Sequence, residues 1–207
     1  ELFKLPDFVN KMMENKWLGS KTGQGFYKKE GKEILTLDLN TLEYRAAKKA
    51  AFGTLELTKT IDKPIDRFKV LVKGKDKAGE FYRKSFSGMF AYVSNRIPEI
   101  SDELYKIDDA MKAGFGWENG PFEIWDAIGV EKGIEIMKAE GLEPAAWVTE
   151  MLDSGSKSFY SIKEGATYFY NIPTKAQTKV PGQDAFIILN NIRESKKVWN
   201  NSGAIIQ

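Results

Sequence analysis

The stretch Asp76–Pro98, DKAGEFYRKSFSGMFAYVSNRIP, decides the fold class of this 207-residue chain. Its apolar residues recur at intervals of three and four, which is the period of one face of an α-helix. Pro98 stands where the pattern stops, as expected of a residue that cannot continue a helix. We therefore predict a long amphipathic helix from Asp76 to Ile97. Its apolar face consists of Ala78, Phe81, Tyr82, Phe86, Met89, Phe90, Val93 and Ile97.

Shorter helices are expected on both sides of this one, from the same period and from capping residues. After Gly155 short aromatic runs alternate with Gly, Pro and Asn, a pattern typical of short strands and loops. The chain is thus predicted to be mainly α to about residue 155, with a short irregular or β tail. The other expected helices are Pro6–Asn15, Thr41–Phe52, one starting at Pro64, one capped by Ser101 and ended by Gly114, Pro121–Ile128, Val130–Glu140 and Pro144–Leu152. Extended segments are expected at Phe26–Tyr27, Glu33–Leu39, Phe159–Tyr160, Tyr168–Tyr170 and Phe186–Leu189.

The chain contains neither cysteine nor histidine. Disulfides, thiol nucleophiles, Cys/His zinc sites and histidine bases are therefore excluded. The formal net charge is only +2, so no global field favours a nucleic acid or membrane partner. No apolar run approaches the length of a membrane span, and no signal peptide begins the chain. These observations predict a cytoplasmic protein, and Glu1 in the first position fits a processed chain or an excised fragment.

Two glycine clusters, at Gly23–Gly25 and Gly114–Gly116, contain G-x-G but lack the third glycine of a dinucleotide fingerprint. We expect them to be turn glycines, so that no cofactor-binding residue lies in this chain. The acidic residues Glu118, Glu123 and Asp126 could form a carboxylate pair for acid–base chemistry. A solvated helix face is the favoured interpretation, because charge runs usually have that role.

Residues 59–84 carry nine Lys or Arg against four Asp or Glu, whereas residues 98–150 carry four against thirteen. The basic stretch could bind a polyanion, such as the phosphates of coenzyme A or a nucleic acid, and Phe81, Tyr82 and Phe86 could offer stacking. Those aromatic residues fall on the apolar face of the predicted helix, so we expect them in the core and expect no nucleic acid partner. Asn95-Arg96 lies in the last turn of that helix. A structural role for Asn95 is favoured, and donation to a ligand carbonyl is the alternative.

Two segments together resemble the 3-hydroxyacyl-CoA dehydrogenase family. Leu18–Tyr27, LGSKTGQGFY, is similar to the L-G-x-K-T-G-x-G-F-Y signature that closes the helical C-terminal domain of the family. Asp108–Gly116, DDAMKAGFG, and Gly120–Gly129, GPFEIWDAIG, are similar to its D-x-A-M…G-P-F-E-x-x-D-x-x-G signature. The resemblance implies a helical fold like that C-terminal domain, which is itself like the C-terminal domain of 6-phosphogluconate dehydrogenase.

The order of the two signatures is reversed relative to a single family domain. The resemblance therefore implies the tail of one helical copy (1–29), a helical connector (30–84), a second copy (85–155) and an irregular or β segment (156–207). Such tandem copies are similar to multifunctional enzymes of fatty-acid β-oxidation, in which the dehydrogenase is fused to a crotonase-type enoyl-CoA hydratase. The last segment could lead into such a hydratase domain.

The resemblance implies that the parent protein oxidises (3S)-3-hydroxyacyl-CoA with NAD. A preceding Rossmann domain outside this chain would bind NAD and carry the catalytic His–Glu dyad. No catalytic, cofactor-binding or metal-binding residue is then expected here, and the fragment alone should be inactive. It would contribute a wall over the acyl-CoA and pack on neighbouring domains or in a homodimer. Asn95 occupies the place of the family's substrate-positioning Asn and is the candidate substrate contact.

A second hypothesis belongs to another class of function. The chain could be a stand-alone helical interaction module without enzyme activity, whose second copy imitates the partner subunit of a dimer. The gene sequence on either side of residues 1–207 distinguishes the two hypotheses. A strand-Gly-x-Gly-x-x-Gly-helix pattern upstream favours the enzyme, and start and stop codons at the edges favour the module.

Overall fold

A computed structural model describes residues 4–192, 199–200 and 205–206 of the chain. The chain divides into two compact units, Glu1–Ala51 (unit 1) and Phe52–Gln207 (unit 2). The division falls inside the stretch that we expected to be a helical connector, residues 30–84. Each unit has its own internal packing and is described separately.

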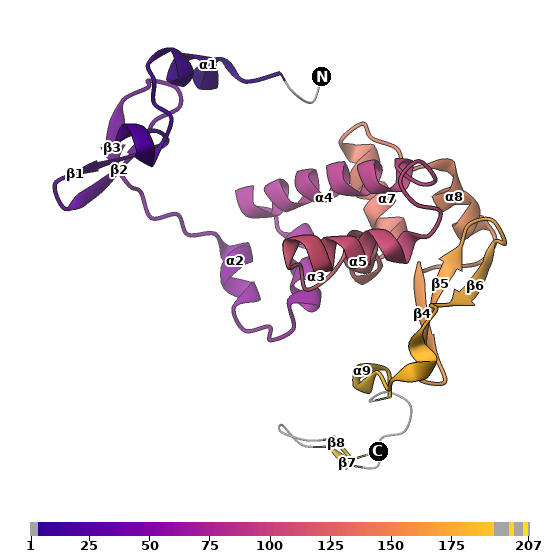
Figure 1. Ribbon diagram of the computed structural model, residues 1–207. Coiled ribbons are helices and arrows are strands. Elements are labelled where there is room, and N and C mark those ends of the chain that lie inside the picture. The colour runs from indigo at the N-terminus through magenta and orange to yellow at the C-terminus, as the bar shows by residue number, and fades with distance from the viewer. Residues whose placement is uncertain (1–3, 193–198, 201–204, 207) are drawn as a thin grey trace. The chain divides into compact units, whose positions relative to one another are not determined.

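Unit 1 consists of a helix followed by a small antiparallel sheet of order β1-β2-β3 (Figure 1). The helix is α1 (Asp7–Glu14), and a short 3₁₀ turn, η1 (Ser20–Thr22), precedes the sheet. The strands are β1 (Tyr27–Glu30), β2 (Glu33–Leu37) and β3 (Tyr44–Ala46). The helix predicted at Pro6–Asn15 and the early extended segments are thereby confirmed.

The predicted helix at Thr41–Phe52 is wrong. Its first part forms β3, in which Tyr44 lies opposite Leu37 of β2. The Tyr44 hydroxyl donates to the carbonyl of Gly25 over 2.7 Å, and Arg45 forms an ion pair with Asp38 over 3.1 Å. These contacts to distant residues override the helix propensity of the alanine-rich segment, which is a weak preference. The first half of the expected helical connector is accordingly sheet and irregular chain.

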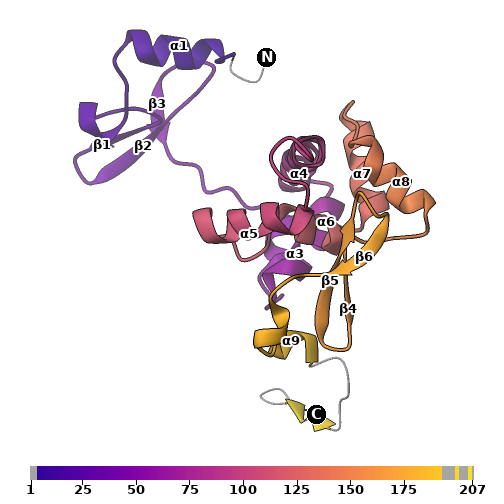
Figure 2. The same ribbon diagram turned by 45° about the vertical axis from the view of Figure 1, so that its right-hand side comes forward.

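Unit 2 is a group of helices with a second antiparallel sheet, β4-β5-β6, beside them (Figures 1 and 2). Most of the predicted helices and the β-rich tail are confirmed. Within the predicted segment 156–207, residues 156–192 and a final antiparallel pair at 199–200 and 205–206 are described, and the other residues lie outside the described part. The elements are α2 (Gly53–Thr58), α3 (Pro64–Lys73), α4 (Lys77–Asn95), α5 (Leu104–Phe115), α6 (Pro121–Ile128), α7 (Val130–Ala139), α8 (Ala146–Asp153), β4 (Tyr160–Lys163), β5 (Ala166–Asn171), β6 (Ala176–Lys179), the 3₁₀ turn η2 (Gln183–Ala185), α9 (Leu189–Ile192), β7 (Trp199–Asn200) and β8 (Ile205–Ile206).

The long helix α4 begins where the sequence predicts. The side chain of Asp76 caps it by accepting a hydrogen bond from the Gly79 amide over 3.0 Å. Phe86 and Phe90 on its apolar face are buried. Phe81, which we expected in the core, is 64% exposed because it shares its face of the helix with exposed Tyr92.

Both ends of α5 differ from the prediction. Helix α5 begins at Leu104, and Ser101 does not cap it: the Ser101 hydroxyl accepts a hydrogen bond from the Glu103 amide instead. The helix passes Gly114 and ends at Phe115, and the next residue, Gly116, has a φ of +67° that favours glycine. The strand expected at Phe186–Leu189 is also wrong, because no described strand pairs with it and α9 starts at its last residue.

A column of aromatic rings forms the centre of unit 2. Phe90 of α4 stacks on Trp125 of α6 with ring centroids 4.7 Å apart, and Phe159 meets Trp125 edge to face at 5.0 Å. All three side chains are fully buried. Helix α7 lies against this column at Gly133, where an added Cβ would come within 2.1 Å of the Trp125 ring nitrogen. Close approach of the two helices therefore requires glycine there.

This approach gives a first prediction. Gly133→Ala forces the Trp125 ring to move and should lower the free energy of unfolding by about 1–3 kcal/mol. Gly88→Ala is the matched control, because an added Cβ at that position of α4 meets nothing within 4 Å. The control should raise the free energy of unfolding by about 0.5–1 kcal/mol through helix propensity. Urea unfolding of both variants measures the effects, and equal stabilities would contradict this account of the core.

Candidate functional site

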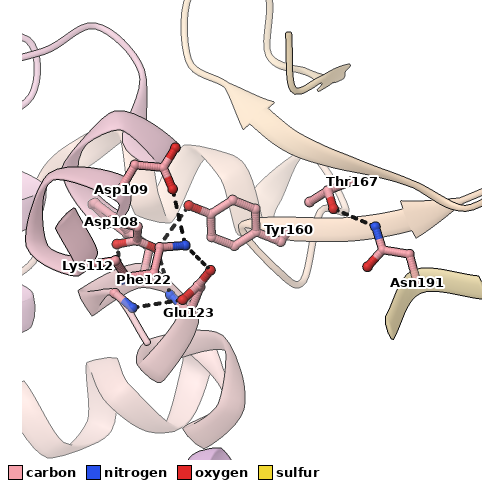
Figure 3. A network of polar contacts seen from close by, with 9 residues as sticks. Asp108, Asp109, Lys112, Phe122, Glu123, Tyr160, Thr167 and Asn191 are labelled. Carbon is pink, nitrogen blue, oxygen red and sulfur yellow. Dashed lines mark hydrogen bonds and ion pairs between the residues drawn. The ribbon is translucent and has the colours of Figure 1, made fainter. Parts of the chain in front are cut away.

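A buried carboxylate connects three elements of unit 2 (Figure 3). Asp108 of α5 accepts hydrogen bonds from the amides of Phe122, over 2.9 Å, and Glu123, over 3.0 Å. These amides belong to the first turn of α6, whose N–H groups have no partner within the helix. The Tyr160 hydroxyl donates to the same carboxylate over 2.9 Å. Asp108 thus joins α5 to the start of α6 and to β4.

A second carboxylate continues this connection. Asp126 of α6 accepts hydrogen bonds from the amides of Phe159 and Tyr160, both over 2.8 Å. These two residues stand where the chain enters β4. Asp108 and Asp126 together therefore fix α6 between α5 and the sheet, and we call them the paired aspartates.

Glu123 completes the first turn of α6. Its carboxylate accepts from the Gly120 amide over 2.8 Å and from the Lys112 ammonium over 2.8 Å. Gly120 is required for close approach, because an added Cβ would lie 2.3 Å from the Asp108 side chain. A solvated helix face is predicted for Glu118, Glu123 and Asp126, but Glu118 is exposed in the loop between α5 and α6, and the two residues on α6 are partly buried. The prediction is wrong for the other two because the helix packs with that face against α5 and β4.

The paired aspartates have perturbed acidities. Burial raises the pKa of Asp108 to about 7, against the effect of its amide and hydroxyl donors. Burial likewise raises the pKa of Asp126 to about 7. Burial and the neighbouring Asp108 raise the pKa of Tyr160 above its ordinary value. Each carboxylate oxygen already accepts a hydrogen bond, so this geometry suits a structural link between elements.

An apolar groove runs along α4. One cavity of about 330 Å³ lies between α4 and α5, and a neighbouring cavity of about 320 Å³ lies between α4 and α3. Both are lined by Met89 and Trp117, so they form adjacent parts of one groove, which we call the α4 groove. The first part is lined almost wholly by carbon. Its other lining residues are Tyr92, Val93, Arg96, Ile100, Ile107, Ala110, Met111 and Pro121.

Arg96 brings a positive charge to the α4 groove. Its guanidinium lies 5.5 Å from the centre of the Tyr92 ring and pairs with Glu99. The Nε atom of Arg96 is buried and has no hydrogen-bond partner among the described residues. Asn95, the predicted substrate contact, is exposed and does not line the groove. Its side-chain amide donates to the Ala91 carbonyl over 2.8 Å, which fits the structural role favoured by the sequence.

The remaining candidates have structural contacts. Gly23 adopts a φ of +80° in a turn that the Thr22 hydroxyl stabilises by accepting from the Leu18 amide over 3.0 Å. In the basic stretch, Arg83 donates to the carbonyls of Val72 and Gly74 at the end of α3. The described residues contain no group of three or more acidic side chains arranged to hold a metal ion. No helix in the described part of the chain combines the length and apolar character of a membrane span.

Sequence reasoning missed Asp108 and Tyr160. Asp108 appeared only as part of a family signature, and Tyr160 only as part of a strand. The sequence does contain one relevant observation: a helix that starts at Gly120-Pro121 leaves amides that need an acceptor. Nothing in the local sequence identifies which carboxylate that acceptor is.

The comparisons with known proteins match one part of unit 2 to a known domain family. Residues 99–168 match the C-terminal domain of 3-hydroxyacyl-CoA dehydrogenase. The match includes α5 to α8, and both paired aspartates lie within it.

Individual relatives match larger parts of the chain. A Bacillus subtilis (strain 168) protein, provisionally named a 3-hydroxyacyl-CoA dehydrogenase, is 45% identical over 205 residues, which cover 99% of this chain and 26% of the relative. A Rickettsia felis protein, provisionally named a fatty acid oxidation complex trifunctional enzyme, is 28% identical over 120 residues, 56% of this chain and 15% of its own length. A Rickettsia prowazekii protein with the same name is 27% identical over 128 residues, 60% of this chain and 16% of its own. The chain thus spans about a quarter of the Bacillus relative. No solved structure gives a significant match.

The perturbed acidities give a second prediction. Between about pH 4 and pH 7 the folded protein holds protons on the paired aspartates that the unfolded chain has released. The free energy of unfolding should therefore fall as pH rises through this window and become level above it. Urea unfolding at several pH values measures the slope.

Asp126→Asn is the informative variant. It removes one of the two titrating groups, so the difference in unfolding free energy between about pH 4.5 and pH 7.5 should be smaller than in the unmodified chain. Asp38→Asn is the control, because its pKa is lowered by hydrogen bonds from the Asn40 amide and Arg45 and it titrates below this window. A slope that Asp126→Asn leaves unchanged would rule out titration of this carboxylate.

Proposed function

We propose that this chain is part of an NAD-dependent (3S)-3-hydroxyacyl-CoA dehydrogenase of fatty-acid β-oxidation, that it works in the cytoplasm, and that it is inactive alone. The likeness of 205 residues to the Bacillus subtilis relative carries the proposal, supported by the match of residues 99–168. NAD accepts the hydride when it is bound, and a Rossmann domain outside this chain would hold it. This chain would contribute binding surface and domain packing.

The proposed arrangement has residues 1–29 as the end of one helical copy and residues 85–155 as a second copy. The reversed order of the two signatures supports it. The names of the two Rickettsia relatives support a longer chain with further activities, including the proposed enoyl-CoA hydratase domain. The proposed fold of the helical copy is that of the C-terminal domains of this family and of 6-phosphogluconate dehydrogenase.

The α4 groove is the proposed wall for the acyl chain of the substrate. Its carbon-lined part between α4 and α5 offers dispersion contacts to a hydrocarbon chain, and covering it with such a chain would remove apolar surface from water. The buried Nε of Arg96 could donate to a substrate oxygen at the edge of the groove. Asn95 remains a proposed substrate contact, which would require its amide to leave the Ala91 carbonyl.

The third prediction tests the groove in the full-length protein. Met111→Glu places a charge in the carbon-lined part of the groove and should raise KM for a long-chain 3-hydroxyacyl-CoA by about tenfold or more. KM for a short-chain substrate should change much less. Phe115→Glu is the matched control on the same helix, because Phe115 is 75% exposed and does not line the groove. Equal effects of the two variants, or of the two chain lengths, would overturn the acyl-wall assignment.

The fourth prediction concerns the chain by itself and Asn95. Purified residues 1–207 should form no NADH from 3-hydroxyacyl-CoA and NAD, because the proposed dyad and NAD domain lie elsewhere.

In the full-length protein, Asn95→Ala should raise KM for the 3-hydroxyacyl-CoA, because the proposed amide contact with the substrate is lost, with little loss of stability. Lower stability with unchanged kinetics would contradict the contact. NADH formation by the isolated chain would contradict the proposed division of roles.

A further inference from the structure

Unit 1 and the end of unit 2 contain the same structural module. Helices α1 and α8 are each eight residues long and are preceded by residues of nearly identical conformation, Pro6 (φ −60°, ψ 151°) and Ala145 (φ −61°, ψ 148°). After each helix, a backbone amide donates a hydrogen bond to the carbonyl of the residue five positions earlier. The Trp17 amide donates to the Met12 carbonyl over 2.8 Å, and the Ser156 amide donates to the Met151 carbonyl over 3.1 Å. The end geometry of the two helices is therefore the same.

The sheets that follow the two helices span the same length of chain and have the same register. Residues 26–46 of unit 1 correspond one by one to residues 159–179 of unit 2. The first pairing has Tyr27 opposite Thr36 in one sheet and Tyr160 opposite Phe169 in the other. The second pairing has the same register, residues 35 with 46 and residues 168 with 179. A polar side chain at the second turn accepts from the amide three residues later in both cases, at Asp38 and at Asn171.

The module also brings its helix and its sheet together in the same way. Phe8 of α1 meets Phe26 edge to face with ring centroids 6.4 Å apart. At the corresponding positions of unit 2, Trp147 meets Phe159 edge to face at 5.8 Å. Two copies of one module are thus present in one chain, within different surroundings.

The two copies differ in what covers them. In unit 2, Phe159 is fully buried because Phe122 and Trp125 of α6 pack on it at 5.1 and 5.0 Å. In unit 1, Phe26 is 50% exposed. It lines an open, mainly apolar pocket of about 180 Å³ together with Val9, Met12, Met13, Trp17 and Leu18.

The amides that Asp126 binds have counterparts in unit 1 as well. Asp126 accepts from the amides of Phe159 and Tyr160, which correspond to those of Phe26 and Tyr27. Among the described residues, no side chain accepts a hydrogen bond from either amide of unit 1. The surface therefore offers an apolar pocket beside two adjacent N–H donors, a combination that fits an aromatic side chain next to a carboxylate.

We propose that this surface of unit 1 binds a helix with the chemistry of α6: an aromatic side chain that fills the pocket and an aspartate that accepts from the amides of Phe26 and Tyr27. The occupant is a segment that precedes residue 1 in the longer protein, a statement that rests on the proposed function. A second copy of this chain does not offer such a helix, because Phe122 and Trp125 of its own α6 are fully buried.

The test uses the whole chain, labelled for amide NMR, and a synthetic peptide of this chain's residues 118–131 as the probe. Adding the peptide should shift the amide signals of Phe26 and Tyr27. A peptide with Asp126→Asn should bind about tenfold more weakly, because one buried charge-assisted contact is lost. A peptide with Glu123→Gln is the matched control. It also loses one negative charge, but at a side chain that is not proposed to contact the two amides. It should bind with nearly the affinity of the original.

The outcomes separate this proposal from the proposed function, since no enzyme activity is measured. Unmoved signals of Phe26 and Tyr27 at millimolar peptide, or equal binding of the Asp126→Asn and original peptides, would overturn the proposed surface. Shifts of these two amides with protein concentration in the absence of peptide would overturn the proposed occupant, because a second copy would then bind. Phe26→Ala in the chain should also weaken peptide binding, with unchanged signals of unit 2 showing that it still folds.

Discussion

Burial of backbone N–H groups is the constraint on which unit 2 depends. The first turn of α6 and the entry to β4 both lie in the interior, where an unpaired amide is costly. Asp108 accepts hydrogen bonds from the amides of the first turn of α6, and Asp126 accepts them from the amides at the entry to β4. These links hold α6 between α5 and the sheet, and Trp125 of the same helix packs against Phe90 and Phe159 in the aromatic column. Packing and hydrogen bonding thus depend on the same two side chains.

Local pattern predicted the elements whose stability is local. The apolar period of α4 and the helix predicted at Pro121–Ile128 both correspond to observed structure. The pattern failed at Thr41–Phe52, where pairing with β2 and a tyrosine hydroxyl bond to Gly25 decide the conformation. It failed again at Asp126, whose partners lie more than thirty residues away in sequence. Whether a carboxylate faces solvent or buried amides depends on tertiary contacts that periodicity does not encode.

The repeated module is consistent with the proposed tandem arrangement, which rests on the reversed order of the two family signatures. The signature segment Leu18–Tyr27 leads into the sheet of unit 1, and Phe159-Tyr160 leads into the corresponding sheet after α8. Beyond Phe-Tyr, the aligned sheets have little sequence in common, so the sequence alone did not show the repeat. Register and turn geometry persist because the backbone hydrogen bonds and the polar second turn fix them, and many side chains are compatible with these. The proposed tandem arrangement of a dehydrogenase fragment draws support from this repeat.

Amide hydrogen exchange on the unmodified 207-residue chain tests the central claim most directly, because the two copies of the module are compared in one molecule. Phe159 and Tyr160 should exchange only when unit 2 unfolds, since Asp126 holds their amides in the core. Phe26 and Tyr27 should exchange faster by about two orders of magnitude or more, as expected of amides outside a stable core. Similar exchange rates for the two pairs would contradict the account, because the Asp126 carboxylate would then not distinguish a covered module from an open one.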